Sequence, residues 1–194
     1  MKISFLASHG GSAAKQIISA IRGNELAAEV GIVITNNHDS DIYRWCQENT
    51  VNVCHISGRT HPNEDDKDKA ILKVLTDTGT DLVVLSGYMK KIGPLALKEY
   101  SNRMLNIHPS LLPRYGGKGF YGDKVHAAVI ESGDAQSGAT VQFINEEYDE
   151  GPMICQKVVD VELGETVASL KRKVQAIEGE LYIDAIQNIV SDAD

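Results

Sequence analysis

Residues 3–12 read ISFLASHGGS, an apolar run followed by a pair of glycines and a serine. The run Ile3–Ala7 predicts a buried strand, and apolar residues recur at helical spacing from Ser12 onward. The glycines between them leave backbone N–H groups free to face an anion, although the spacing is neither that of a dinucleotide-binding loop nor that of a Walker loop. The stretch therefore predicts a strand-turn-helix unit whose turn either binds a phosphate or is a ligand-free turn capped by Ser12.

The alternation of apolar runs and helical stretches continues to residue 85, which is typical of a parallel sheet flanked by helices. The acidic residues 64–66 suit a helix N-terminus. The expected strands are Ile3–Ala7, Glu29–Ile34, Val51–Ile56 and Leu82–Leu85, and the expected helices are Ser12–Arg22, Ser40–Glu48 and Asn63–Thr78.

The second half follows a different pattern, with a glycine-rich loop at 113–122 and turn-rich residues at 145–151. The two strands that flank this turn predict an antiparallel or mixed part of the sheet, so the fold class is α/β, mostly parallel, with an antiparallel C-terminal part. The expected elements are strands at Arg103–Ile107, Ala139–Ile144 and Met153–Val161, and helices at Lys124–Ser132 and Thr166–Val190.

Charge and cysteine usage restrict the class of protein. The net charge is −8, with 19 basic against 27 acidic residues, which argues against a nucleic-acid partner. No apolar run is long enough for a signal segment or a membrane span. Cys46, Cys54 and Cys155 are odd in number and lie among apolar residues, which indicates reduced, inert thiols in a cytoplasmic protein, and no metal-ligand spacing occurs.

Asn106 and His108 lie two residues apart at the end of an expected strand, so their side chains share one face at the edge where open α/β folds bind ligands. An imidazole can transfer a proton, and a carboxamide can donate a hydrogen bond to an oxyanion. Asp149 follows in a turn; if that turn folds over His108, its carboxylate favours the imidazolium. The alternatives are a structural histidine and a plain turn former, and His55, His61 and His126 are interpreted as packing or surface residues.

Three motifs carry a resemblance to a known family: NIHPSLLP at residues 106–113, GATV at 138–141 and YDEGP at 148–152. With GGS at 10–12 and LSGYM at 85–89, they make the chain similar to the folate-dependent phosphoribosylglycinamide formyltransferases. The resemblance implies a Rossmann-like formyltransferase fold in one domain, with a phosphate-binding half at 1–100 and a catalytic, folate-binding half at 101–194. It implies formyl transfer from 10-formyltetrahydrofolate to the amine of glycinamide ribonucleotide in purine biosynthesis, without a metal.

The resemblance also assigns residues. Asn106, His108 and Asp149 converge as the catalytic group, in which Asn106 stabilises the oxyanion and His108, held protonated by Asp149, assists proton movement to the folate nitrogen. The acceptor substrate is bound by Gly10, Gly11, Ser12, Ala13, Gln175 and Glu178. The folate is bound by Met89, Lys90, Lys91, Ile92, Asn106, Asn145, Glu146, Glu147, Tyr148 and Asp149. The partners are small molecules only, and the protein is a monomer or a homodimer.

The chain departs from the family pattern at a few positions. Ala13 stands where the family usually has asparagine, Gln142 where it has histidine, and Lys90 and Lys91 where it has an arginine and an apolar residue. These differences keep three alternatives open: a formyltransferase that acts on another small amine, a 10-formyltetrahydrofolate hydrolase, and a folate-binding module without catalysis.

Overall fold

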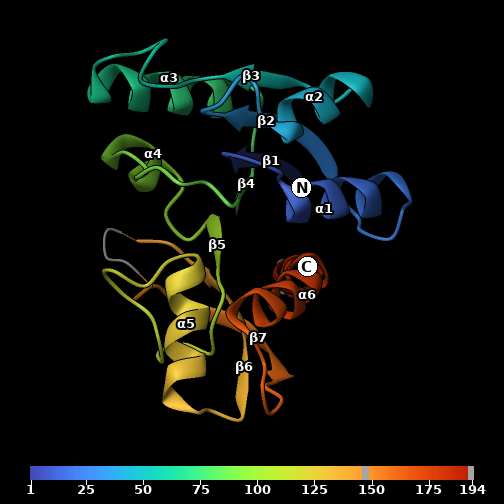
Figure 1. The fold of residues 1–194 in the computed structure, drawn as a ribbon. Coiled ribbons are helices and arrows are strands. Elements are labelled where there is room, and N and C mark those ends of the chain that lie inside the picture. The colour runs from blue at the N-terminus through green and yellow to red at the C-terminus, as the bar shows by residue number, and fades with distance from the viewer. Residues whose placement is uncertain (146–148, 192–194) are drawn as a thin grey trace. The chain divides into compact units, whose positions relative to one another are not determined.

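A computed structural model of the chain describes residues 1–145 and 149–191, and its contacts divide into two compact units, Met1–Leu105 and Asn106–Asp194. Seven strands are hydrogen-bonded in the order β3-β2-β1-β4-β5-β6-β7 (Figure 1). The pairs β1–β2, β1–β4, β2–β3 and β4–β5 are parallel, which confirms the predicted α/β class with a mostly parallel sheet. The glutamate and tyrosine residues at 146–148, which include predicted folate-binding positions, lie outside the described residues.

The first unit is a parallel sheet with helical crossovers. Helix α1 packs against β2 and β4, and α2 packs against β2 and β3. The residues of β4 and all but the first of β1 are buried, which explains their continuous apolar sequences. The strands are β1 (Lys2–Ala7), β2 (Glu29–Thr35), β3 (Val53–His55) and β4 (Leu82–Ser86), and the helices are α1 (Ser12–Arg22), α2 (Asp41–Glu48), α3 (Glu64–Asp77) and α4 (Pro94–Glu99).

Local sequence determines where these helices start. Asn63 caps α3 by accepting hydrogen bonds from the backbone N–H groups of Asp65 and Asp66, at 2.8 and 3.3 Å. The acids of the first turn therefore lie at the positive end of the helix dipole, as predicted. Ser40 caps α2 in the same way, accepting from the N–H of Tyr43.

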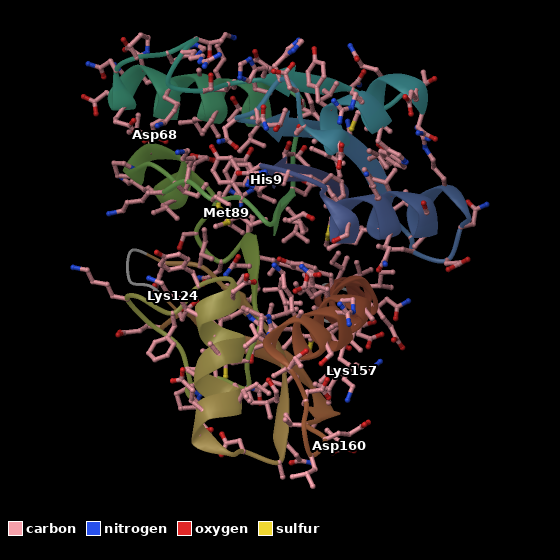
Figure 2. The ribbon with its side chains drawn as sticks, in the orientation of Figure 1. His9, Asp68, Met89, Lys124, Lys157 and Asp160 are labelled. Carbon is pink, nitrogen blue, oxygen red and sulfur yellow. The ribbon has the colours of Figure 1, made fainter. Side chains whose placement is uncertain are left out.

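Helix α4 was not predicted, because six residues are too few to display a helical period. Its N-terminus is held by Asp68 of α3, whose carboxylate accepts hydrogen bonds from the backbone N–H groups of Leu95 (2.7 Å) and Ala96 (3.1 Å). Asp68 is 3% exposed and lies on the side of α3 that faces α4 (Figure 2). A side chain at Gly93 would collide with this carboxylate, so glycine is required there.

The second unit contains an antiparallel pair and two helices. Strand β5 (Met104–His108) begins in the first unit and ends in the second. Strands β6 (Gln136–Phe143) and β7 (Met153–Asp160) pair antiparallel, as predicted, and α6 packs against both of them. The other helices are α5 (Asp123–Ser132) and α6 (Val167–Ser191) (Figure 1).

The pairing of β6 with β7 is interrupted once. Val141 pairs with Cys155, but the next residue, Gln142, pairs with Met153, so Ile154 is an extra residue in β7. A bulge of this kind twists the ladder locally and redirects the side chains beside it.

The described residues include neither a membrane-spanning helix nor a group of metal ligands. No helix in 1–145 or 149–191 is long and apolar enough to span a bilayer. Within the same ranges, no three His, Cys, Asp or Glu side chains are grouped so that they could hold a metal ion.

Candidate active site

His108 lies at the end of β5, in the second unit, and is 4% exposed. Its Nδ1 is 3.3 Å from Oδ2 of Asp149, and its Nε2 is 2.7 Å from the carbonyl oxygen of Tyr115. Both oxygens are acceptors and cannot donate, so a proton on each ring nitrogen is required to satisfy both contacts. An imidazolium could therefore donate to both oxygens at once, whereas a neutral ring could donate to only one.

The carbonyl that faces His108 belongs to an anchored residue. Tyr115 has a φ of +56° and its hydroxyl donates to Oδ2 of Asp134 at 2.5 Å. Arg114 also bonds Asp134, with 2.7 Å between Nη2 and Oδ1. The start of the glycine-rich loop is therefore tied to the end of α5, and the position of the Tyr115 carbonyl is set by these contacts.

Asp149 has a partly buried carboxylate that accepts three contacts. Its Oδ2 accepts from the backbone N–H of Gly117 at 2.9 Å in addition to facing His108, and its Oδ1 accepts from Nε2 of Gln142 at 3.1 Å. Burial is the largest single influence and acts to raise the pKa of Asp149, but the hydrogen bond and charge of His108 together with the bonds from Gly117 and Gln142 outweigh it. The net effect is a pKa below the ordinary value, so the carboxyl is ionised.

Asn106 precedes His108 by two positions on β5, so the two side chains project from the same face of the strand. Asn106 is partly buried, and its carboxamide makes no hydrogen bond to another residue of 1–145 or 149–191. Both of its amide hydrogens are therefore available for a ligand oxygen.

The segment after His108 is fixed to the neighbouring strands by buried polar contacts. Thr140 of β6 donates to the carbonyl of Ser110 at 2.7 Å and accepts from the N–H of Leu112 at 3.1 Å. Gln156 of β7 donates to the carbonyl of Leu112 at 2.9 Å. These bonds satisfy backbone groups that leave the regular ladder and hold the end of β5 in place.

Two buried residues beside the site had no catalytic role in the sequence interpretation. Gln142 is 1% exposed and bonds Asp149, as described above. His126 of α5 is 2% exposed, and its burial lowers its pKa; the charge of Asp123 opposes this, whereas Lys171 and His108 add to it. The helical period places His126 inside the fold, but no local signal shows that either residue lies near His108.

The predicted phosphate loop lies in the first unit, at the N-terminus of α1. The N-cap is Gly11, with a φ of +58°, and no side chain caps the helix, so the interpretation of Ser12 as the N-cap is wrong. A Cβ at Gly11 would lie 2.8 Å from side-chain atoms of Ile42, which leaves no room for a serine or alanine. Ser12 is exposed and Ala13 is 3% exposed, and their N–H groups, at the start of the helix, have no intrahelical acceptor.

The other predicted binding residues are divided between the units. Met89 follows β4 in the first unit, is 55% exposed and donates its N–H to Oγ of Ser8 at 2.8 Å (Figure 2). Lys90 and Lys91 beside it are exposed, whereas Ile92 is buried. In the second unit, Asn145 and Gln175 are exposed.

Glu178 lies on α6 in the second unit and is partly exposed. Burial raises the pKa of its carboxyl from 4.5 to about 7. The carboxyl is therefore divided between its neutral and ionised forms near neutral pH.

Comparison with known proteins places this chain in a family. The model of the formyl transferase family matches residues 1–186. The chain is 34% identical over 192 residues to the chloroplastic phosphoribosylglycinamide formyltransferase of Arabidopsis thaliana, covering 98% of this chain and 66% of the relative. It is 31% identical over 181 residues to the phosphoribosylglycinamide formyltransferase of Haemophilus influenzae, covering 93% of this chain and 83% of the relative.

A solved structure gives the same result. The crystal structure of phosphoribosylglycinamide formyltransferase from Bacillus halodurans superposes with a TM-score of 0.90 at 30% identity, covering 100% of this chain and 97% of that one. The chain spans 66% and 61% of the lengths of the two plant relatives that it matches. With a family model that matches nearly its whole length, the chain belongs to the formyl transferase family.

Proposed function

We propose that this protein transfers a formyl group from 10-formyltetrahydrofolate to the amine of glycinamide ribonucleotide, a step of purine biosynthesis. The observation that supports this most directly is His108, held between the Asp149 carboxylate and the Tyr115 carbonyl, on the same strand face as the free carboxamide of Asn106. The named function of the relatives in the preceding section supports the same reaction.

The reaction needs a hydrogen-bond donor for the formyl oxygen and a proton carrier for the folate nitrogen. The amine nitrogen attacks the formyl carbon, and the negative charge that develops on the formyl oxygen accepts a hydrogen bond from the Asn106 amide. The oxyanion then re-forms the carbonyl as the bond from the formyl carbon to the folate nitrogen breaks, and His108 delivers a proton to that nitrogen. During this step the Nε2–H group of His108 leaves the Tyr115 carbonyl and donates to the substrate instead. The attacking nitrogen, which is positively charged after the attack, gives its extra proton to His108, so the imidazolium is restored and the charge balances.

The remaining residues bind the two substrates. The backbone N–H groups at Gly10, Gly11, Ser12 and Ala13 lie at the N-terminus of α1 and suit a ribosyl phosphate. Because the side chain of Ala13 is buried, this position contributes its backbone and needs no polar side chain. Gln175 and Glu178 contact the acceptor, and Met89–Ile92 and Asn145–Asp149 bind the folate.

The proposed function also implies the partners, the location and the organisation of the enzyme. Its partners are small molecules, it works in the cytoplasm as a monomer or homodimer, and residues 1–100 and 101–194 are its phosphate-binding and catalytic halves. No metal takes part in the proposed reaction.

The direct test mixes purified protein with 10-formyltetrahydrofolate and glycinamide ribonucleotide and follows the loss of formyl-folate. We expect turnover that depends on the ribonucleotide and that falls by at least about 10²-fold in His108→Ala. Formate release without any amine would instead identify a hydrolase, and turnover with other amines but not with the ribonucleotide would identify another acceptor. Folate binding without turnover would identify a binding module.

A further inference from the structure

Among the described residues, Gln142 is the one whose side chain contacts Oδ1 of Asp149, the carboxylate oxygen that does not face His108. Its Nε2 donates to Oδ1 of Asp149 at 3.1 Å, while Oδ2 receives the N–H of Gly117 and faces His108. Each oxygen of the carboxylate therefore has its own donor. A carboxylate restrained at both oxygens cannot rotate about its last bond without losing a contact.

The contacts around Gln142 fix the orientation of its side-chain amide. The residue is 1% exposed on β6, directly beside the bulge at Ile154 that redirects side chains in this part of the β6–β7 pair. Its Oε1 is buried without a hydrogen-bond partner in the described part of the chain. Turning the amide over would place an oxygen against the Asp149 carboxylate, so the bond to Asp149 is kept although an acceptor is left unmatched.

We propose that Gln142 is a positioning residue, which holds the Asp149 carboxylate toward His108 through a hydrogen bond that does not titrate. An amide donates at every pH, whereas a histidine at this position would donate with both nitrogens only when charged. The inference rests on the proposed role of Asp149, but its first test needs no turnover. Gln142 thus has a function at a position where the family usually has histidine.

Few other groups act on the pKa of Asp149 in its pair with His108. His108 is the charged group that acts on Asp149, and the other contributions come from burial and from the donors Gly117 and Gln142. His126 of α5 is the neighbouring titratable group that interacts with His108, and its burial keeps it neutral. Loss of the Gln142 donor therefore removes a distinct stabilising contact from the Asp149 anion.

The experiment compares the titration of Asp149 in the ligand-free protein with and without this donor. Carboxyl carbons of labelled aspartates are followed by NMR, and the Asp149 signal is identified by its loss in Asp149→Asn. In Gln142→Met, which has a similar length but no donor, we expect the titration midpoint of Asp149 to rise by about one pH unit.

A matched control lies on the same strand. Gln136 is exposed, and its Nε2 is 3.4 Å from Oδ1 of Asp160, so Gln136→Met removes a glutamine–aspartate contact in solvent. We expect the Asp149 midpoint to stay unchanged in that variant. An Asp149 midpoint that does not move in Gln142→Met, or that moves equally in Gln136→Met, would overturn the proposal.

Activity supplies an independent readout. In Gln142→Met the acid limb of the pH profile of kcat should move upward with the Asp149 midpoint, while KM for the acceptor stays within about twofold. A simple packing role would lower thermal stability without moving this limb. If the ribonucleotide is not turned over, the NMR result still decides the positioning role, so the two proposals fail separately.

A second variant tests the proposal if Gln142→Met does not fold. Gln142→Glu keeps the shape of the side chain but places a second carboxyl beside Asp149, so one of the two should titrate well above its ordinary range. Two carboxyls that titrate independently and normally in this variant would show that residue 142 does not face Asp149, and would contradict the proposal.

Discussion

Asp149 combines a strained backbone with a carboxylate that has three contacts. Its φ is +58°, in the left-handed region that Asn and Asp tolerate better than other residues with side chains. Replacement by asparagine therefore preserves the turn while it exchanges an ionised acceptor for a neutral amide.

We predict that Asp149→Asn still folds, because the backbone conformation suits both residues, but that the free energy of unfolding falls by about 1–3 kcal/mol, because the carboxylate that accepts three contacts is lost. kcat should fall by about 10²- to 10⁴-fold, since the imidazolium of His108 loses its counter-charge. Urea unfolding and steady-state kinetics on the same preparation check the two parts. Near-normal kcat in a folded variant would contradict the role given to the His108–Asp149 pair.

Glu178 gives a prediction about pH at the same scale. Its pKa is raised by burial to about 7 in the folded protein, above the ordinary value of 4.5, so the folded state holds this proton more tightly than the unfolded state. The resulting stability is complete below about pH 4.5 and is lost as the pH rises through 7.

We therefore expect Glu178→Gln, which stays neutral, to lose less stability than the wild type between pH 5 and pH 8, by roughly 2 kcal/mol. Urea unfolding at the two pH values measures this difference. Glu180→Gln is the control, because Glu180 is exposed on the same helix and pairs with Lys157 at the surface. Equal pH dependence in the wild type and Glu178→Gln would contradict the raised pKa.

At the scale of elements, α4 depends on a contact from outside itself. The helix has only six residues and its N-cap, Gly93, has no side chain to accept from the first N–H groups. Asp68 of α3 supplies the acceptor, so the position of α4 is set by a buried carboxylate on another helix.

We predict that Asp68→Ala lowers the free energy of unfolding by about 2–3 kcal/mol, because two N–H groups lose a charged acceptor. Asp77→Ala is the matched control on α3, where an exposed pair with Lys73 contributes less than about 1 kcal/mol. Urea unfolding of both variants makes the comparison. Equal losses in the two would show that the Asp68 contacts do not stabilise α4.

At the scale of the whole molecule, the reactivity of the cysteine thiols measures how well both units are folded. Cys46 on α2 and Cys54 on β3 lie in the first unit, and Cys155 on β7 lies in the second. All three are free, and burial raises the pKa of each from 9.0 to about 11. The thiolate, which is the reactive form, is therefore scarce at pH 8.

We expect an aromatic disulfide reagent at pH 8 to react with the native protein at least about 10²-fold more slowly than with the protein in urea, where three thiols become available. Glutathione at the same pH gives the reference rate. A saturating substrate should slow the native reaction further, because it stabilises the folded state. Rapid labelling of the native protein would contradict the burial of these thiols.

Sequence patterns predicted most of the fold at the level of single elements. The apolar runs of β1 and β4, the acidic first turn of α3 and the period of α6 each depend on residues within a few positions of one another. Interactions this local leave a signature in the sequence. Helix α4 was missed although Pro94 stands in its first turn, because six residues are too few to show a helical period and the acceptor for its N-terminus, Asp68, lies on another helix.

The candidate site divides in the same way. The sequence by itself determined that Asn106 and His108 share a strand face, because strand geometry brings side chains two apart to the same side. Only the tertiary structure decided that Asp149 and the Tyr115 carbonyl meet at His108 and that the amide of Gln142 bonds Asp149. Those contacts join residues of different strands and loops, so they depend on the register and the bulge of β6 and β7, which no local pattern encodes.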